Sequence, residues 1–137
     1  MKHLELTNLK YVGMDIVAEL IHKNQSENSG YDFRLGDLVR DPLPSVDLVF
    51  CRDCFVHLSY ADIQAAINNL KKSQSLYLLT TSFPQHKNFN IVTGNWRPVN
   101  LQAAPFNFPA PILFIREDEA GDYRDKSLAL WKLSDLP

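Results

Sequence analysis

Long apolar runs are missing from this sequence of 137 residues. No run approaches the roughly 18 residues that a membrane span needs, and the first residues are too polar for a signal peptide. A basic excess is missing as well, because 14 Lys and Arg against 16 Asp and Glu leave a formal net charge of −2. Binding to a nucleic-acid backbone usually requires a basic face. We therefore expect neither a membrane nor a nucleic-acid partner.

Cysteine and glycine are both scarce. Cys51 and Cys54 are the only cysteines, and a pair so close in sequence gives no disulfide framework. A reducing, cytoplasmic setting is therefore the default expectation. The five glycines stand at positions 13, 30, 36, 94 and 121, so no two are near each other. Dinucleotide-dependent oxidoreductases need a glycine-rich turn for the cofactor phosphates, and the sequence disfavours that class.

The segment from Ser45 to Asp53 is the feature around which the rest of the chain is organised. It holds a nearly continuous apolar run at positions 46 and 48–51, with β-branched and aromatic members. Such a short run predicts a strand that is buried on both faces, as in a parallel sheet covered by helices. The run ends at Arg52 and Asp53, and ligands bind at the carboxyl ends of strands in open α/β sheets. We therefore predict a small-ligand site at this edge.

Predicted strands and helices alternate along the rest of the chain. Strands are predicted at 9–14, 31–35, 75–83, 112–116 and 127–133, and helices at 16–23 and from about 60 to 72. Ser59 and Asp62 have the spacing of a capping box for the second helix, whose apolar positions are 63, 66, 67 and 70. The last two strands predict an antiparallel hairpin.

These elements predict one α/β domain over residues 1–137. Its sheet is expected to be doubly wound and mostly parallel, with the antiparallel hairpin at its C-terminal edge. Residues 84–111 hold five prolines and several aromatic residues. We expect them to form a long, irregular but ordered excursion, because loops of this length usually have a function.

Two acidic residues follow predicted strands and are candidates for nucleotide binding. Asp15 ends the strand at 9–14, where a carboxylate can accept from both hydroxyls of a ribose. Taken alone, the position favours the alternative, a plain helix N-cap. Asp37 follows Gly36, and its carboxylate can accept from the exocyclic amine of a purine while Leu38 packs on the ring. The alternative is an ordinary Gly-Asp turn.

Charged residues at the end of the central strand are candidates for chemistry. Arg52 and Asp53 must meet water, each other or a ligand. His57 follows them and is a candidate general base, although a histidine just before a helix cap is more often a structural hydrogen bonder. Cys51, Cys54 and His57 do not predict a metal site, because such a site needs about four ligands and the sequence holds no second cluster of Cys and His.

The excursion contributes one further set of candidates. Trp96, Arg97 and Asn100 bring together an aromatic ring, a guanidinium and an amide. Such a set suits a wall for a bound substrate. It suits equally a loop that is pinned to the core by its tryptophan.

Together these residues resemble the class I S-adenosylmethionine-dependent methyltransferases. The matching pieces are Tyr11 to Asp15, Gly36 to Leu38, Val46 to Asp53 and His57 with Leu58, and they occur in the family's order and spacing over roughly residues 9 to 133. The resemblance implies a Rossmann-like sheet, with the cofactor ribose on Asp15, its adenine at Asp37 and Leu38, and its methionine part beside Arg52. It also implies that the methyl acceptor, a small molecule or a protein, enters beside Asp53 and His57.

The chain departs from the family at its start. The first family strand and its glycine-rich loop have no counterpart, so we expect an N-terminally truncated version of the fold. Three accounts fit: a fragment of a longer enzyme, a compacted relative in which strands 9–14 and 46–51 pair directly, or a gap filled by residues 1–8 or a partner chain. Open strand edges recruit strands, and self-association is therefore expected.

Two functions follow from the resemblance. The first is methyl transfer from S-adenosylmethionine to a small-molecule or protein acceptor. The second is a non-catalytic binding module that kept the fold and lost the cofactor, and the missing glycine loop favours it.

Overall fold

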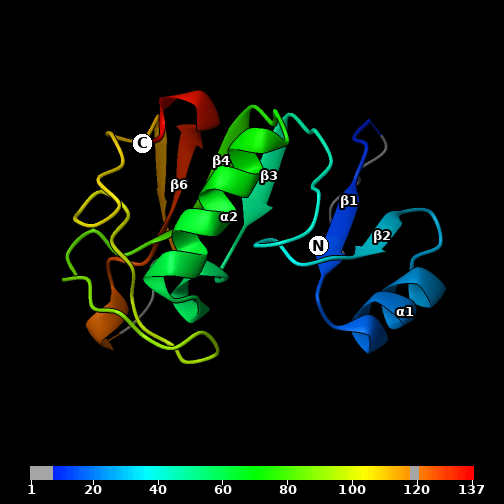
Figure 1. The fold of residues 1–137 in the computed structure, drawn as a ribbon, viewed down its shortest axis with the longest axis horizontal. Helices are drawn as coiled ribbons and strands as arrows, with labels where there is room; N and C mark the ends of the chain where they lie inside the picture. Colours follow the sequence, from blue (N-terminus) through cyan, green and yellow to red (C-terminus); the bar gives the residue numbers. More distant parts are fainter. Residues whose placement is uncertain (1–7, 118–120) are drawn as a thin grey trace. The chain divides into compact units, whose positions relative to one another are not determined.

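The computed structural model describes residues 8–117 and 121–137 and divides the chain into two compact units, residues 1–41 and 42–137. Most of the 1–8 segment, invoked above as a gap filler, lies outside the described residues. The elements alternate between strands and helices, as predicted (Figure 1). The single domain expected over 1–137 stays a prediction, and each unit is described by itself.

The first unit holds two parallel strands and one helix. Strands β1 (Val12–Asp15) and β2 (Asp32–Leu35) pair in parallel, with Val12 opposite Asp32 and Asp15 opposite Leu35. The connection between them contains α1 (Ala18–Glu27). A parallel pair joined by a helix is the unit that the sequence predicted.

Helix α1 begins two residues later than expected and continues through the predicted turn. The prediction ended it at 23 because residues 24–30 are rich in Asn, Ser and Gly. Instead Gln25, Ser26 and Glu27 lie exposed in the last turns, where Lys23 Nζ and Glu27 Oε1 are 4.0 Å apart at i, i+4 spacing. Asn28 then ends the helix, with its backbone N–H on the carbonyl of Asn24.

The second unit contains a mixed four-stranded sheet with the order β3-β4-β6-β5. Its strands are β3 (Leu48–Cys51), β4 (Tyr77–Ser82), β5 (Leu113–Arg116) and β6 (Ser127–Lys132). Strands β3 and β4 are parallel, whereas β6 is antiparallel to both β4 and β5. The mixed α/β class and the C-terminal antiparallel hairpin are therefore confirmed.

Helix α2 (Tyr60–Lys72) covers one face of this sheet and forms the core with it (Figure 1). All four predicted apolar positions of the helix are buried: Ile63, Ala66, Ile67 and Leu70. They pack in the same core as Leu78 and Trp131, which face the helix side of β4 and β6. The helical spacing in the sequence thus identified the buried face correctly.

The predicted cap of α2 is present, with a third residue added to it. Ser59 is the N-cap, and its Oγ accepts from the backbone N–H of Asp62 at 3.2 Å. In the usual box a Glu or Gln reaches back to the N-cap N–H, but the Asp62 side chain is shorter. The Thr93 hydroxyl bridges the gap, because it accepts from the Ser59 N–H at 2.8 Å and donates to the Asp62 carboxylate.

We expect the substitution Thr93→Val to lower the free energy of unfolding of the second unit by about 1 kcal/mol, because the Ser59 N–H loses its acceptor. Urea unfolding followed by the fluorescence of buried Trp131 measures this loss. Ser134→Ala is the matched control, since the exposed Ser134 hydroxyl bonds, within the described part of the chain, only to neighbouring Asp135 at 2.8 Å. Equal losses in the two variants would contradict the bridging role of Thr93.

Strand β3 is covered on one face only, which corrects the prediction of two-sided burial. Its residue Val49 pairs with buried Leu78 on the side that faces α2. On the other side Leu48 and Phe50 are 47% and 50% exposed. The reason is that the only α-helix in the described part of this unit lies on the opposite face.

The excursion over 84–111 is ordered and irregular, as predicted. Backbone bonds tie it to the core, for example from Phe83 N–H to the Val99 carbonyl at 2.8 Å and from Arg97 N–H to the Val56 carbonyl at 3.0 Å. Its residues Val99, Leu101, Phe106 and Phe108 are buried. Across the described residues, none of the helices combines the length and the apolar character needed to cross a membrane.

Candidate functional site

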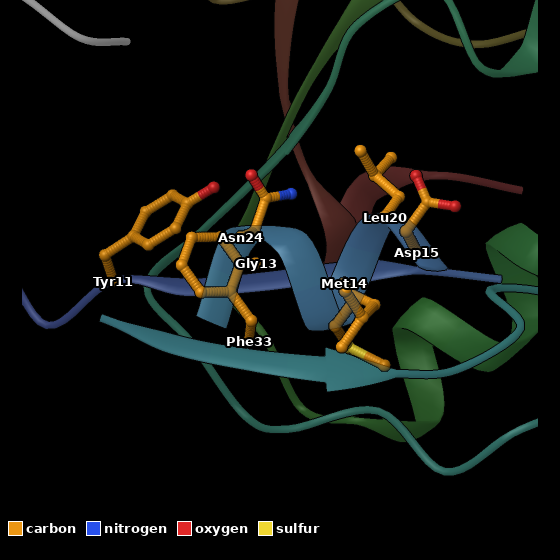
Figure 2. Close-up of a pocket in the computed structure, with 8 residues that line it drawn as sticks. Tyr11, Gly13, Met14, Asp15, Leu20, Asn24 and Phe33 are labelled. Carbon is orange, nitrogen blue, oxygen red and sulfur yellow. The ribbon is translucent and has the colours of Figure 1, made fainter. Parts of the chain in front are cut away.

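A pocket of about 190 Å³ lies in the first unit and is lined by residues of β1, β2 and α1. Figure 2 shows its labelled lining residues: Tyr11, Gly13, Met14, Asp15, Leu20, Asn24 and Phe33. A Cβ at Gly13 would lie 2.7 Å from Cδ1 of Phe33, so glycine is needed for the ring to lie against β1. Burial raises the pKa of Tyr11, which keeps its hydroxyl neutral. The pocket has a carboxylate at the end of β1.

Asp15 is that carboxylate, and only part of it is used by the protein. Its Oδ1 accepts from the backbone N–H of Val17 at 2.9 Å, which supports the turn that enters α1. No described residue donates to Oδ2. The cap and the ligand interpretations are therefore compatible, because the two oxygens are used separately.

Asp37 lies beside Asp15 at the carboxyl ends of the paired strands. The Gly36 N–H donates to the Asp15 carbonyl at 3.0 Å, which holds these two ends together. The Asp37 carboxylate makes a local turn, since Oδ1 accepts from the Val39 N–H and Oδ2 from Arg40, both at 2.8 Å. The Arg40 side chain is 77% exposed, so that ion pair is weak. A ligand can displace it at small cost.

Arg52 and Asp53 lie together at the carboxyl end of β3, as predicted, but bound to other charges. Arg52 Nε is 2.8 Å from Glu117 Oε1, and Arg52 Nη1 is 3.1 Å from Asp53 Oδ2. Lys126 Nζ is also 3.1 Å from Asp53 Oδ2. Asp53 has a positive φ of 53° and its N–H donates to the Thr81 hydroxyl at 2.8 Å. The four charged side chains form one network that includes Asp53.

His57 is exposed and held by the excursion. Its Nδ1 is 3.1 Å from the carbonyl oxygen of Asn95. A carbonyl only accepts, so Nδ1 carries the proton of the neutral ring and Nε2 remains as an acceptor. The general-base assignment stays a prediction that this geometry permits.

Arg97 and Asn100 make structural contacts inside the second unit, and the substrate-binding role expected for them stays a prediction. Arg97 is completely buried, and its guanidinium donates to the carbonyls of Phe55 and Leu58, each at 2.7 Å. Burial lowers the pKa of Arg97, and the charge lies 5.7 Å from the ring centre of Tyr60. Asn100 is also buried and donates to the Pro84 carbonyl at 2.8 Å. These two residues, and not the tryptophan, pin the excursion.

Trp96 is the exception in this set, because 43% of it is exposed. It packs edge-on against Tyr123, with ring centroids 4.9 Å apart. It remains available as a wall for a bound molecule.

Cys51 and Cys54 form no disulfide with each other, and both are thiols. A hydrogen bond with Cys54, together with burial, raises the pKa of the Cys51 thiol well above its ordinary value, so it is a poor nucleophile. The described ranges contain no group of three or more His, Cys, Asp or Glu that could hold a metal ion.

One pair near the end of β4 was missed by the sequence reasoning. His86 follows β4 by four positions, and Asp125 precedes β6 by two. They are 3.1 Å apart although they are separated by 39 positions in sequence. The sequence offered one signal for this pair, because His86 and Asp125 each lie next to a predicted strand end at the ligand-binding edge. The rule that ligands bind at this edge was applied to β3 alone.

Comparison with known proteins places the chain in a family. A family model described as a methyltransferase domain matches residues 1–73, which is just over half of the 137 residues. No curated protein sequence matches. The solved structures, in contrast, include 16 matching chains.

Three of these structures show the shared fold. The N-methyltransferase NodS from Bradyrhizobium japonicum WM9 is 12% identical, with a TM-score of 0.59 over 88% of this chain and 71% of its own. Magnesium protoporphyrin IX methyltransferase (ChlM) from Synechocystis PCC 6803, with bound SAM, is 15% identical with a TM-score of 0.61. The PH0226 protein from Pyrococcus horikoshii OT3 is 15% identical with a TM-score of 0.57.

The chain spans 58% of the ChlM chain, 71% of NodS and 72% of PH0226, so it corresponds to part of each. At these identities the structural likeness shows the fold, and the family model shows the descent. The chain therefore belongs to the methyltransferase domain family, as its resemblance to the class I S-adenosylmethionine-dependent methyltransferases predicted.

Proposed function

We propose that this chain binds S-adenosylmethionine and carries part of the site that transfers its methyl group. The observation that carries the proposal is Asp15, which ends β1 beside a pocket and has one carboxylate oxygen without a donor among the described residues. A ribose offers two adjacent hydroxyl donors to such a carboxylate. Family membership over residues 1–73 supports the same assignment.

The family resemblance assigns further residues to the remaining parts of the cofactor. In the proposal Asp37 accepts from the adenine amine after releasing exposed Arg40, and Leu38 packs on the purine ring. Arg52, in the second unit, is proposed to contact the methionine part. The bound cofactor supplies an electrophilic methyl group, and the protein needs only to align an acceptor with it and, for some acceptors, to remove a proton.

Asp53 and His57 are proposed to align the acceptor, which is a small molecule or a protein. Asp53 is suited to orientation because Lys126 and Thr81 hold it in place. The Nε2 atom of His57 is left as an acceptor for a proton. Trp96 supplies an exposed aromatic wall. Strand β3 stands at the end of its sheet, which supports the expected self-association.

The second candidate is a binding module of methyltransferase descent without catalysis. The observation that favours it is the absence of a glycine-rich loop, since the five glycines are all isolated in sequence. Such a loop lets backbone approach a ligand closely. The two candidates differ in whether this chain binds the cofactor at all.

Calorimetric titration with S-adenosylhomocysteine separates them. We expect binding by the wild-type chain that weakens about tenfold or more in Asp15→Asn, because a charged acceptor is lost while the remaining amide oxygen can still cap Val17. Glu19→Gln is the matched control, since it removes an exposed carboxylate from the first turn of the neighbouring helix.

The opposite result is equally informative. No heat at millimolar ligand, from a chain shown to be folded by circular dichroism, would exclude cofactor binding by this chain and leave the binding module. Equal weakening in Asp15→Asn and Glu19→Gln would show that general charge, and not Asp15, determines the affinity.

A further inference from the structure

The second unit contains a histidine–aspartate pair that the proposed cofactor site does not use. Nδ1 of His86 is 3.1 Å from Oδ2 of Asp125. The His86 side chain is 25% exposed, whereas that of Asp125 is only 4% exposed. The two residues lie where β4 ends and β6 begins, the edge at which parallel strands of this fold class present ligand sites.

The pair has a defined protonation pattern. Because a carboxylate only accepts, the neutral His86 ring carries its proton on Nδ1 and leaves Nε2 as an acceptor. The backbone N–H of Gln85 donates to the same Asp125 oxygen at 2.8 Å and holds the carboxylate in position. The other oxygen, Oδ1, is buried without a partner among the described residues.

Aromatic rings surround the imidazole. Tyr123 stacks on His86, with a centroid separation of 5.6 Å and an interplanar angle of 23°. Trp96 contacts Tyr123 edge-on, and Phe83 packs behind His86 at 5.7 Å. Phe83 is buried, but Trp96 and Tyr123 are 43% and 39% exposed. The imidazole is thus set beside an exposed aromatic surface.

His86 and His57 differ in the group that holds Nδ1. Nδ1 of His57 donates to the backbone carbonyl of Asn95, whereas Nδ1 of His86 donates to the buried carboxylate of Asp125. A charged acceptor makes the stronger hydrogen bond, so the carboxylate orients the His86 imidazole more firmly. His86 is also beside aromatic rings that can hold a flat molecule.

We propose that His86, Trp96 and Tyr123 form the site for a methyl acceptor that is an aromatic ring bearing a hydroxyl group, with His86 in place of His57 as the group that takes the proton. The methyl-transfer step of this proposal rests on the proposed function. Binding of the aromatic acceptor does not depend on it. The ring lies against Trp96 and Tyr123, and its hydroxyl donates to Nε2 of His86. Asp125 acts as a positioning residue that fixes the imidazole.

The step balances as follows in atoms and charge. The hydroxyl proton passes to Nε2 of His86, and the acceptor oxygen keeps the bonding pair. That oxygen takes the methyl group of the cofactor and leaves the carbon–sulfur electron pair on the sulfur. The products are an aryl methyl ether and S-adenosylhomocysteine, and the imidazolium releases its proton to water.

NMR of the complete 137-residue chain tests the site without cofactor. The indole N–H of Trp96 is followed while 4-hydroxybenzyl alcohol or benzyl alcohol is added, and Trp131, whose indole bonds to Pro109 inside the core, is the internal reference. We expect the Trp96 signal to shift, with the phenol binding about tenfold tighter than the matched alcohol.

The sharp variant is His86→Asn. The asparagine amide nitrogen can replace Nδ1 as the donor to Asp125, but nothing replaces Nε2. The two alcohols should therefore bind this variant with about equal affinity. His22→Asn, at an exposed helix position, should keep the preference. The wild-type comparison of the two alcohols requires no variant, so the test stands even if His86→Asn does not fold.

Each outcome decides between the proposals. Equal binding of both alcohols by the wild type, or a preference that survives in folded His86→Asn, would overturn this site. If S-adenosylhomocysteine binds and the phenol does not, only the acceptor site is wrong. If the phenol binds and S-adenosylhomocysteine does not, the site stands as a binding site and the proposed function is wrong.

Discussion

Replacing Arg97 by methionine is expected to lower the free energy of unfolding of the second unit by about 2–4 kcal/mol. The methionine chain fills the stem volume but donates no hydrogen bonds. The carbonyls of Phe55 and Leu58 then lose donors at 2.7 Å inside the protein. Relief of the buried charge offsets part of this loss. Urea unfolding followed by Trp131 fluorescence gives the value.

Two further variants make this test specific. Arg97→Lys should recover less than half of the loss, because an ammonium is a point charge and cannot bridge two carbonyls as the planar fork does. Arg116→Met is the matched control, since that side chain is exposed and, among the described residues, has one long hydrogen bond of 3.3 Å to the Arg124 carbonyl. A loss below about 1 kcal/mol in Arg97→Met would contradict the pinning role.

Truncating Trp131 to alanine is expected to have an equal or larger effect, about 3–5 kcal/mol. The side chain is only 1% exposed on β6 and packs edge-on with Phe108 at 5.2 Å. Its Nε1 donates to the Pro109 carbonyl at 2.8 Å, which holds the end of the excursion to the sheet. Removal leaves both a cavity and an unsatisfied carbonyl. Far-UV circular dichroism in urea measures the loss.

Trp131→Phe separates the two causes, because it keeps most of the ring and loses the donor. We expect it to cost roughly 1–3 kcal/mol, between the wild type and the alanine variant. Trp96→Ala deletes the same side chain at a site that is 43% exposed, and should cost less than half as much as Trp131→Ala. Similar losses at both positions would show that Trp131 is not a core anchor.

The helix α2 shows how far local pattern predicts structure. Its Ser59 cap and its four buried positions follow from spacing within one element, and all are present. The bridge through Thr93 was not predictable, because Thr93 lies 34 positions after Ser59 in the sequence. A local pattern states that a cap is needed, but not which distant side chain completes it.

Strand β3 shows the corresponding limit for strands. Its apolar run correctly predicted a strand, and the charges after it lie at the expected edge. Its outer face is nevertheless exposed at Leu48 and Phe50. An apolar run indicates that a face of the strand can be buried. Whether that face is buried depends on another element that packs on it.

The sequence by itself determined the family, the order of strands and helices, the terminal hairpin and the carboxylate at the end of β1. These depend on periodicity, caps and strand ends, which are properties of neighbouring residues. Only the tertiary structure decided that Arg97 is a buried tether and that His86 faces Asp125. Those roles depend on partners 42 and 39 positions away in the chain. Folding alone brings such groups within hydrogen-bonding distance, and no local pattern encodes the pairing.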